Sequence, residues 1–137
     1  MGVFKFAIMG AGNIAGRLCE AAALLPDCEV CAVASKSLER AEKFAKANGL
    51  ERFYDDYETM LEREKPDCVY IAVTPNDHAH LSLLCIAHGV PVLCEKAMFQ
   101  NSAEAREVYR AAAEKKVFVM EALWSRFLPP VNKVREW

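Results

Sequence analysis

The sequence of 137 residues lacks an excess of charge of one sign, because 17 Lys and Arg stand against 19 Asp and Glu, for a formal net charge of -2. Without a basic field, we expect neither nucleic acid nor an anionic membrane surface as a partner. The sequence also lacks an apolar run long enough to span a bilayer, and its start lacks the pattern of a secretory signal. We therefore expect a cytoplasmic protein.

The six cysteines lack the arrangement of a zinc or redox site. Cys28 and Cys31 stand at a metal-like spacing in "CEVC", but no second Cys pair and no suitably spaced His pair accompanies them. An extended strand would also direct these two thiols to opposite faces. Reduced, mostly buried thiols that act as small apolar groups are the expectation, with no metal site.

What the sequence does have is a regular alternation of strand-like and helical segments. Hydrophobic residues make up 53% of the chain and charged residues 26%, which is an ordinary composition for one globular core. Such an alternation predicts an α/β fold in which helices cover both faces of a parallel sheet, a doubly wound or Rossmann architecture. The predicted strands lie within 6–9, 29–35, 52–54, 68–73, 90–94 and 117–121, and the predicted helices within 14–25, 37–49, 55–64, 81–89 and 105–112. Ser37 is the expected N-cap and Gly49 the expected end of the second helix, and Asp55 stands at capping-box spacing from Glu58 at the start of the third.

The first apolar strand runs into "GAGNIA", which matches the pattern G-x-G-x-x-G/A. Gly10 would permit a tight turn, Gly12 would let the backbone approach a pyrophosphate, and Ala15 would let helix and strand pack closely. The free N–H groups and positive dipole end of the following helix suit a diphosphate. The alternative is that these glycines serve only the turn. Their place after the first strand of an α/β chain favours dinucleotide binding.

The end of the second strand bears on which dinucleotide binds. NAD-preferring enzymes usually carry an Asp or Glu there for the ribose hydroxyls. Here the residues are Ser35 and Lys36, with Arg40 one turn into the next helix. A lysine and an arginine favour the 2′-phosphate of NADP, with NAD as the second choice. The alternative is that Lys36 is a solvated loop lysine.

Two later segments follow predicted strands and therefore lie at the same edge of the sheet, where ligands bind in open α/β folds. They read "VTPNDHAH" and "LCEKAMF". Lys96 in the second segment would orient a substrate hydroxyl or assist its proton transfer beside a nicotinamide. His78 and His80 are either caps and packing residues or catalytic groups, and His88 is expected at a helix C-terminus.

These residues resemble the glucose–fructose oxidoreductase and inositol dehydrogenase family (Gfo/Idh/MocA), specifically its NAD(P)-binding domain. The resemblance rests on "GAGNIA", "ASKSLERAEKFA", "IAVTPNDH" and "VLCEKA", and the final "VFVMEALWSRFLPPVNKVRE" looks like the dimeric dihydrodiol-dehydrogenase branch. It implies an NAD(P)-dependent oxidoreductase that acts on a sugar, polyol or diol by hydride transfer, and a homo-oligomer in the complete enzyme. Lys96 would be the catalytic residue. Together the residues and the resemblance give these cofactor-binding candidates: Gly10, Gly12, Asn13, Ile14, Ala15, Ser35, Lys36, Arg40, Thr74, Pro75, Asn76, His78, Glu95, Trp124 and Arg126.

The sequence departs from the family pattern in two places. Ala97 replaces the usual proline after Lys96, so we expect a trans peptide there and a less rigidly held lysine. The interval between Thr74 and Glu95 is one residue short, which leaves open whether His78 or His80 matches the family's histidine.

Family members continue into an α+β substrate domain that this sequence does not contain. We expect residues 1–121 to form the dinucleotide-binding domain and residues 122–137 to begin the connection to that second domain. The chain alone is then expected to be inactive. The alternative function is a stand-alone NAD(P)-binding sensor or partner-binding module without catalysis.

Overall fold

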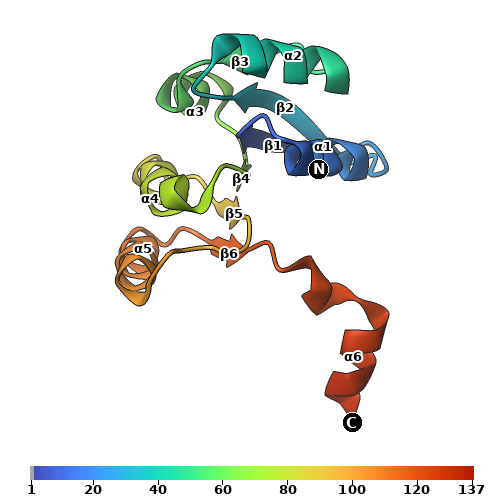
Figure 1. Cartoon of the computed structure of the whole chain (residues 1–137), viewed down its shortest axis with the longest axis vertical. Coiled ribbons are helices and arrows are strands. Elements are labelled where there is room, and N and C mark those ends of the chain that lie inside the picture. The colour runs from blue at the N-terminus through green and yellow to red at the C-terminus, as the bar shows by residue number, and fades with distance from the viewer. Residues whose placement is uncertain (1) are drawn as a thin grey trace.

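The predicted strands form one parallel sheet, which confirms the doubly wound fold (Figure 1). The computed structural model describes residues 2–137. Every neighbouring pair of strands is parallel, in the order β3-β2-β1-β4-β5-β6. The strands are β1 (Phe4–Met9), β2 (Cys28–Ala34), β3 (Phe53–Tyr54), β4 (Cys68–Ile71), β5 (Val92–Cys94) and β6 (Val119–Glu121).

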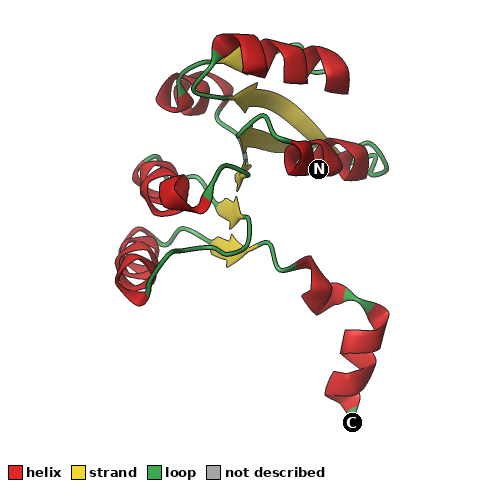
Figure 2. Cartoon of the chain, viewed as in Figure 1, coloured by secondary structure: helices red, strands yellow, loops and turns green. Residues whose placement is uncertain are grey.

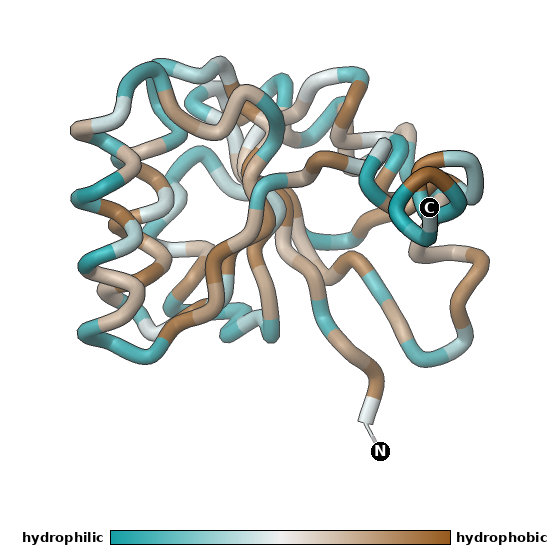
Figure 3. Tube along the Cα trace, turned by 90° about the horizontal axis from the view of Figure 1, so that it is seen from below, coloured by the Kyte–Doolittle hydropathy of each residue, from teal (hydrophilic) through white to brown (hydrophobic). Residues whose placement is uncertain are grey.

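Helices lie on both faces of this sheet (Figures 1 and 2). On one face, α3 (Tyr57–Glu64), α4 (His78–Ala87) and α5 (Ser102–Lys115) cover a core that includes Met60, Leu81 and Cys85. On the other face, α1 (Asn13–Ala22) and α2 (Leu38–Asn48) pack through Ala15 and Phe44. The apolar segments run along the central strands in Figure 3 because a parallel sheet buries both of its faces.

Helix caps explain where several of these helices start and stop. The Ser37 hydroxyl accepts a hydrogen bond from the Arg40 N–H at the start of α2, and Gly49 ends that helix at φ +70°, as the sequence predicts. At α3 the cap is Asp56, whose carboxylate accepts from the Thr59 N–H; the expectation of Asp55 in this role was wrong. Asp56 takes it because it directly precedes the first helical residue.

The first helix is shorter than its apolar spacing indicates. It ends at Ala22, and Leu25 lies beyond it with 54% of its surface exposed. Ile14 at its start is also half exposed. These two side chains therefore lie outside the core: Leu25 follows the end of the helix, and Ile14 lines an open apolar cavity beside Tyr70 and Leu93.

One region of the sheet carries no helix. On the face covered by α1 and α2, the strands β4, β5 and β6 instead line an apolar cavity of about 510 Å³ with Tyr70, Leu93 and Met120. The far wall of this cavity comes from the C-terminal segment, through Trp124 and Phe127 of the short 3-10 helix η2 (Trp124–Phe127). This segment leads into α6 (Pro129–Glu136), which projects away from the sheet (Figure 1).

Among residues 2–137, no helix is both long and apolar enough to cross a membrane. All six cysteines are free thiols, and three of them, Cys68, Cys85 and Cys94, are buried. Within the same described residues, no group of three or more His, Cys, Asp or Glu is placed to hold a metal ion.

Candidate nucleotide-binding site

The candidate site lies where the strand order reverses. β1 and β4 are neighbours at the centre of the sheet, and their chains continue on opposite sides of it, which is the switch point where open α/β sheets bind ligands. At this point Gly10 has φ +110°, and a Cβ there would lie 2.5 Å from the carbonyl oxygen of Ala72. Only glycine fits, so the first glycine of the motif is explained by the fold itself.

Gly12 has a different reason to be glycine. It is the N-cap of α1, in an extended conformation that any residue adopts, and a Cβ there would meet no protein atom within 4 Å. It supplies no side-chain cap, and the first turn of α1 contains no acidic residue. The amino end of α1 therefore faces open space with unpaired N–H groups and an uncompensated positive dipole end. A diphosphate is the group that this geometry suits.

A cavity of about 470 Å³ opens beside this turn. Its walls come from the carboxyl ends of three strands and from helices α2 and α3, which is why residues far apart in sequence meet there. Ser35 lines it and is 6% exposed, whereas Lys36 and Arg40 are exposed at its rim. The lining residues are Gly10, Ala11, Gly12, Ser35, Lys36, Arg40, Tyr57, Ala72, Val73, Thr74, Asn76 and Asp77.

The rim of this cavity carries an ion pair between Lys36 and Asp77, which was not predicted from the sequence. Lys36 Nζ lies 2.6 Å from Asp77 Oδ2, joining the end of β2 to the short 3-10 helix η1 (Pro75–Asp77) that follows β4. The Asp77 carboxylate raises the pKa of the Lys36 ammonium through this hydrogen bond and its charge. A carboxylate thus does stand at this corner, although none is contributed by β2 itself. The sequence separation of 41 residues hid it.

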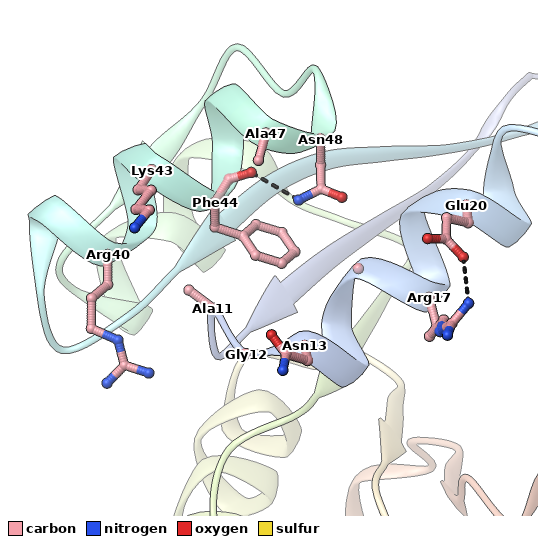
Figure 4. A pocket seen from close by; sticks show the side chains of 11 residues that line it. Ala11, Gly12, Asn13, Arg17, Glu20, Arg40, Lys43, Phe44, Ala47 and Asn48 are labelled. Atoms are coloured by element: carbon pink, nitrogen blue, oxygen red, sulfur yellow. Dashed lines mark hydrogen bonds and ion pairs between the residues drawn. The ribbon is translucent and has the colours of Figure 1, made fainter.

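A second cavity, of about 690 Å³, lies between α1 and α2 (Figure 4). It meets the first cavity at the glycine turn, since Ala11, Gly12 and Arg40 line both. Arg17 on its α1 side is paired with Glu20, at 3.1 Å between Nη1 and Oε2. Arg40 makes no such pair among the described residues, so its guanidinium stays available beside the turn.

The predicted Glu95 and Lys96 follow β5 at the same edge of the sheet but have different surroundings. Glu95 is 9% exposed, and its carboxylate accepts a hydrogen bond from the Tyr70 hydroxyl and another from the Lys96 N–H. Burial and the neighbouring Glu95 raise the pKa of Tyr70. The Lys96 side chain is exposed, so it is free to contact a ligand.

Glu95 also lines the apolar cavity under the C-terminal segment, where it places a carboxylate beside the apolar side chains of Ile14 and Trp124. The candidate residues therefore divide into two groups on either side of the α1 N-terminus. One group surrounds the Lys36 corner, and the other surrounds Glu95. Pro75, Lys96 and Arg126 line none of the three cavities described, and Asn13 lies with Gly12 at the start of α1.

His78 is fully buried, unlike the exposed His80. Its Nδ1 lies 3.1 Å from the Ala97 carbonyl oxygen and 3.0 Å from that of Met98, and its Nε2 lies 3.0 Å from that of Val73. The ring thus ties the loop after β4 to the loop after β5. His88, at the end of α4, is the C-cap as expected.

The expectation of a trans peptide after Lys96 was wrong. The Lys96–Ala97 bond is cis although Ala97 is not proline. The loop around it is set by tertiary contacts, because His78 contacts the carbonyl groups of Ala97 and Met98, and the Met98 N–H donates to Glu121 Oε1 at 3.0 Å. Such contacts are not readable from the local sequence.

Comparison with known proteins identifies the family. The profile of the oxidoreductase family with an NAD-binding Rossmann fold, GFO_IDH_MocA, matches residues 4–123. The chain belongs to this family. Its place among the Gfo/Idh/MocA proteins agrees with the switch-point geometry, since the matched residues include both glycines, the Lys36 corner and the Lys96 loop. The chain is an NAD(P)-binding domain of this family.

Relatives within the Gfo/Idh/MocA family are longer than this chain. It is 40% identical over 134 residues to trans-1,2-dihydrobenzene-1,2-diol dehydrogenase of Mus musculus, across 96% of this chain and 40% of the relative. A 3-ketoreductase from Actinomadura kijaniata, solved with TDP-benzene and NADP, is 26% identical with a TM-score of 0.89 over 98% of this chain and 43% of its own.

A third protein shows the fold alone. An oxidoreductase from Agrobacterium radiobacter, solved with NAD+, L-tartaric acid and magnesium, has a TM-score of 0.90 at 24% identity, over 97% of this chain and 39% of its own. Each of the three alignments covers less than half of the matched protein. The chain therefore spans about two-fifths of the length of the proteins it matches.

Proposed function

We propose that this chain holds NADP, and NAD less tightly, as the nucleotide-binding part of an oxidoreductase that acts on a sugar, polyol or diol. The observation that carries the proposal is the contrast between the two glycines. A side chain at Gly10 would collide with the protein's own backbone at Ala72. A side chain at Gly12 would meet no protein atom, so the space beside it is open for a ligand. The residues present fit a dinucleotide diphosphate at that position.

The adenosine end of the cofactor would occupy the cavity between the Lys36 corner and Thr74. Ser35 offers a buried hydroxyl, and Lys36 and Arg40 offer positive charge for a 2′-phosphate. Thr74 and Asn76 would line the opposite wall. Two cations against the single carboxylate of Asp77 support a preference for NADP.

The nicotinamide end would extend past the α1 N-terminus toward the Glu95 group of residues. When bound, the nicotinamide supplies the hydride or accepts it. Lys96 would hold a substrate hydroxyl and move its proton, because its ammonium is exposed at this edge of the sheet. Glu95, paired with Tyr70, would hold the start of the Lys96 loop through the Lys96 N–H.

Substrate orientation would come from a second domain, to which residues 122–137 lead. The apolar cavity of about 510 Å³ over β4–β6 and the exposed Trp124 and Phe127 support this proposal, because they leave apolar surface beside the site. Residues 1–121 would then be the nucleotide-binding unit. The family resemblance and the similarity to the dihydrodiol dehydrogenases support this substrate class.

Direct titration of the chain with NADPH, followed by nicotinamide fluorescence, tests the proposal. We expect Gly12→Val to weaken binding by more than about tenfold, since its branched side chain would fill the space for the diphosphate. Gly16→Ala is the matched control on the same helix, because its Cβ would make only an ordinary contact of 3.5 Å with Asn48. A folded Gly12→Val protein that binds NADPH as well as the parent would contradict this placement of the cofactor.

A further inference from the structure

Asp77 occupies the N-cap position of α4, yet its side chain makes no capping hydrogen bond. Aspartate is among the preferred capping residues, because its carboxylate usually accepts from the N–H groups of the first turn. Here the carboxylate instead contacts Lys36 Nζ at 2.6 Å, at the rim of the cavity. The side chain of Asp77 is 24% exposed and that of Lys36 is 69% exposed, so the carboxylate is the less exposed partner of the pair.

We propose that Asp77 sets the selectivity of this site between NADP and NAD by competing with the 2′-phosphate for Lys36. The inference rests on the proposed function, since it concerns the same cavity. Asp77, in the segment that follows β4, would be the residue that limits the preference for NADP. Asp77 would thereby keep NAD acceptable to a site whose other rim charges favour NADP.

The geometry gives the carboxylate two effects on a 2′-phosphate. First, it takes up one of the three hydrogen-bond donors of the Lys36 ammonium and neutralises its charge. Second, a phosphate oxygen bound to the same ammonium would lie about 4–5 Å from Asp77 Oδ2, given hydrogen bonds of about 2.7–2.9 Å on each side. Carboxylate and phosphate are both anionic, so they repel at that distance.

The repulsion is large enough to measure. A phosphate monoester carries about -1.5 to -2 charge at pH 7. Even with the dielectric constant of water, its repulsion from a carboxylate about 4–5 Å away corresponds to roughly tenfold in affinity. NAD presents an uncharged ribose hydroxyl at the same place, so its affinity is little affected. Asp77 therefore acts on the ratio of the two affinities.

Arg40 does not cancel this effect. It lines both cavities at the glycine turn, and it makes no ion pair among the described residues. It attracts the 2′-phosphate independently of Asp77. Asp77 is paired with Lys36 and not with Arg40. Its carboxylate therefore lowers the affinity for the 2′-phosphate at the Lys36 side of the rim only.

The test is the substitution Asp77→Asn, which keeps the size and hydrogen-bonding ability of the side chain but removes its charge. Dissociation constants for NADPH and NADH are measured by fluorescence titration at an ionic strength of about 0.01 M, where the Debye length is about 30 Å. We expect the NADPH constant to fall about tenfold and the NADH constant to change less than about twofold.

Glu62→Gln is the matched control, since it also removes one negative charge. Glu62 is exposed on α3 and lines a cavity with Pro66 and Gly89, near the start of β4 and so at the opposite edge of the sheet from the site. We expect this variant to leave the ratio of the two constants unchanged. Raising the salt concentration should shrink the effect of Asp77→Asn, because the interaction is electrostatic.

Two results would overturn the inference while leaving the proposed function intact. One is binding of both cofactors by Asp77→Asn with the parental ratio of constants. The other is a loss of NADH affinity in this variant with NADPH unchanged, which would make Asp77 a ribose ligand. Failure of the parent chain to bind either cofactor would instead reject the proposed function, and the inference with it.

Discussion

Gly10 lies against the backbone of Ala72 across the two central strands of the sheet. A Cβ on Gly10 would stand 2.5 Å from the Ala72 carbonyl oxygen and 2.7 Å from its carbonyl carbon. The Ala72 N–H meanwhile donates to the Met9 carbonyl at 2.8 Å, so the two chains are fixed at this separation. The tight turn that opens the nucleotide site is thus also part of the sheet's own packing.

Gly10→Ala should destabilise the fold by about 2–4 kcal/mol, because it combines a backbone clash with a positive φ that alanine rarely adopts. Urea unfolding of the two proteins measures the difference. Gly12→Ala is the control, and we expect its free energy of unfolding to stay within about 1 kcal/mol of the parent, since its Cβ meets no protein atom and the change only weakens the N-cap of α1. Equal stability of the Gly10→Ala protein and the parent would contradict the structure of this turn.

Replacement of Lys36 by Asp should weaken the binding of NADPH far more than the binding of NADH. The change removes a phosphate partner and places a second carboxylate beside Asp77, so the loss for NADPH is expected to exceed about tenfold. Fluorescence titration with both cofactors checks this. Lys43→Asp, also on α2, is a charge-matched control, since Lys43 lines the cavity between α1 and α2 and not the cavity at the Lys36 corner. An unchanged NADPH-to-NADH ratio would show that Lys36 does not discriminate.

The buried thiols make stability depend on pH above 9. Burial raises the pKa of Cys68 from its ordinary 9.0 to about 12. A raised pKa in the folded state means that the thiol stabilises the fold fully below pH 9 and less as pH rises, because only the unfolded chain ionises. The expected loss is up to about 1.4 kcal/mol per pH unit for this group.

Urea unfolding with a reductant at pH 8, 9 and 10 measures this slope, and Cys68→Ala isolates the contribution of one thiol. We expect the variant to lose stability with pH less steeply than the parent. Identical slopes in the two proteins would show that Cys68 ionises alike in the folded and unfolded chains.

The chain is expected to bind the dinucleotide without turning over substrate. The glycine turn, the α1 N-terminus and the Lys36 corner all lie within it, whereas hydride transfer needs a substrate carbon held in a defined orientation. Misplacement by about 1 Å can cost on the order of 100-fold in rate. Lys96, exposed at an open edge, cannot provide that orientation alone.

Incubation with NADP and a panel of sugars, polyols and diols, followed by absorbance of the reduced nicotinamide, tests this expectation. Turnover that co-purifies with the chain and disappears in Lys96→Ala would contradict it. Tight cofactor binding by a natural protein that has no substrate domain of its own or from a partner would favour the sensor function over the enzyme.

Local sequence was enough to predict much of this protein. Apolar strand segments, the Ser37 cap and the Gly49 helix end are decided within a few residues, and all of them were confirmed. The Gly10–Gly12 turn was predictable because a strand, a glycine turn and a helix follow one another without interruption. The choice of Asp56 over Asp55 as the cap was not, since adjacent aspartates satisfy the same pattern.

What only the tertiary structure decided are the contacts between separate strand ends. Asp77 reaches Lys36, Tyr70 donates to Glu95, and His78 joins the loops after β4 and β5, because a parallel sheet gathers the carboxyl ends of its strands at one edge. The sequence determined which residues arrive at that edge. Which side chains become partners there depends on strand order and register. Packing of the whole sheet sets both, so they cannot be predicted from a short stretch of sequence.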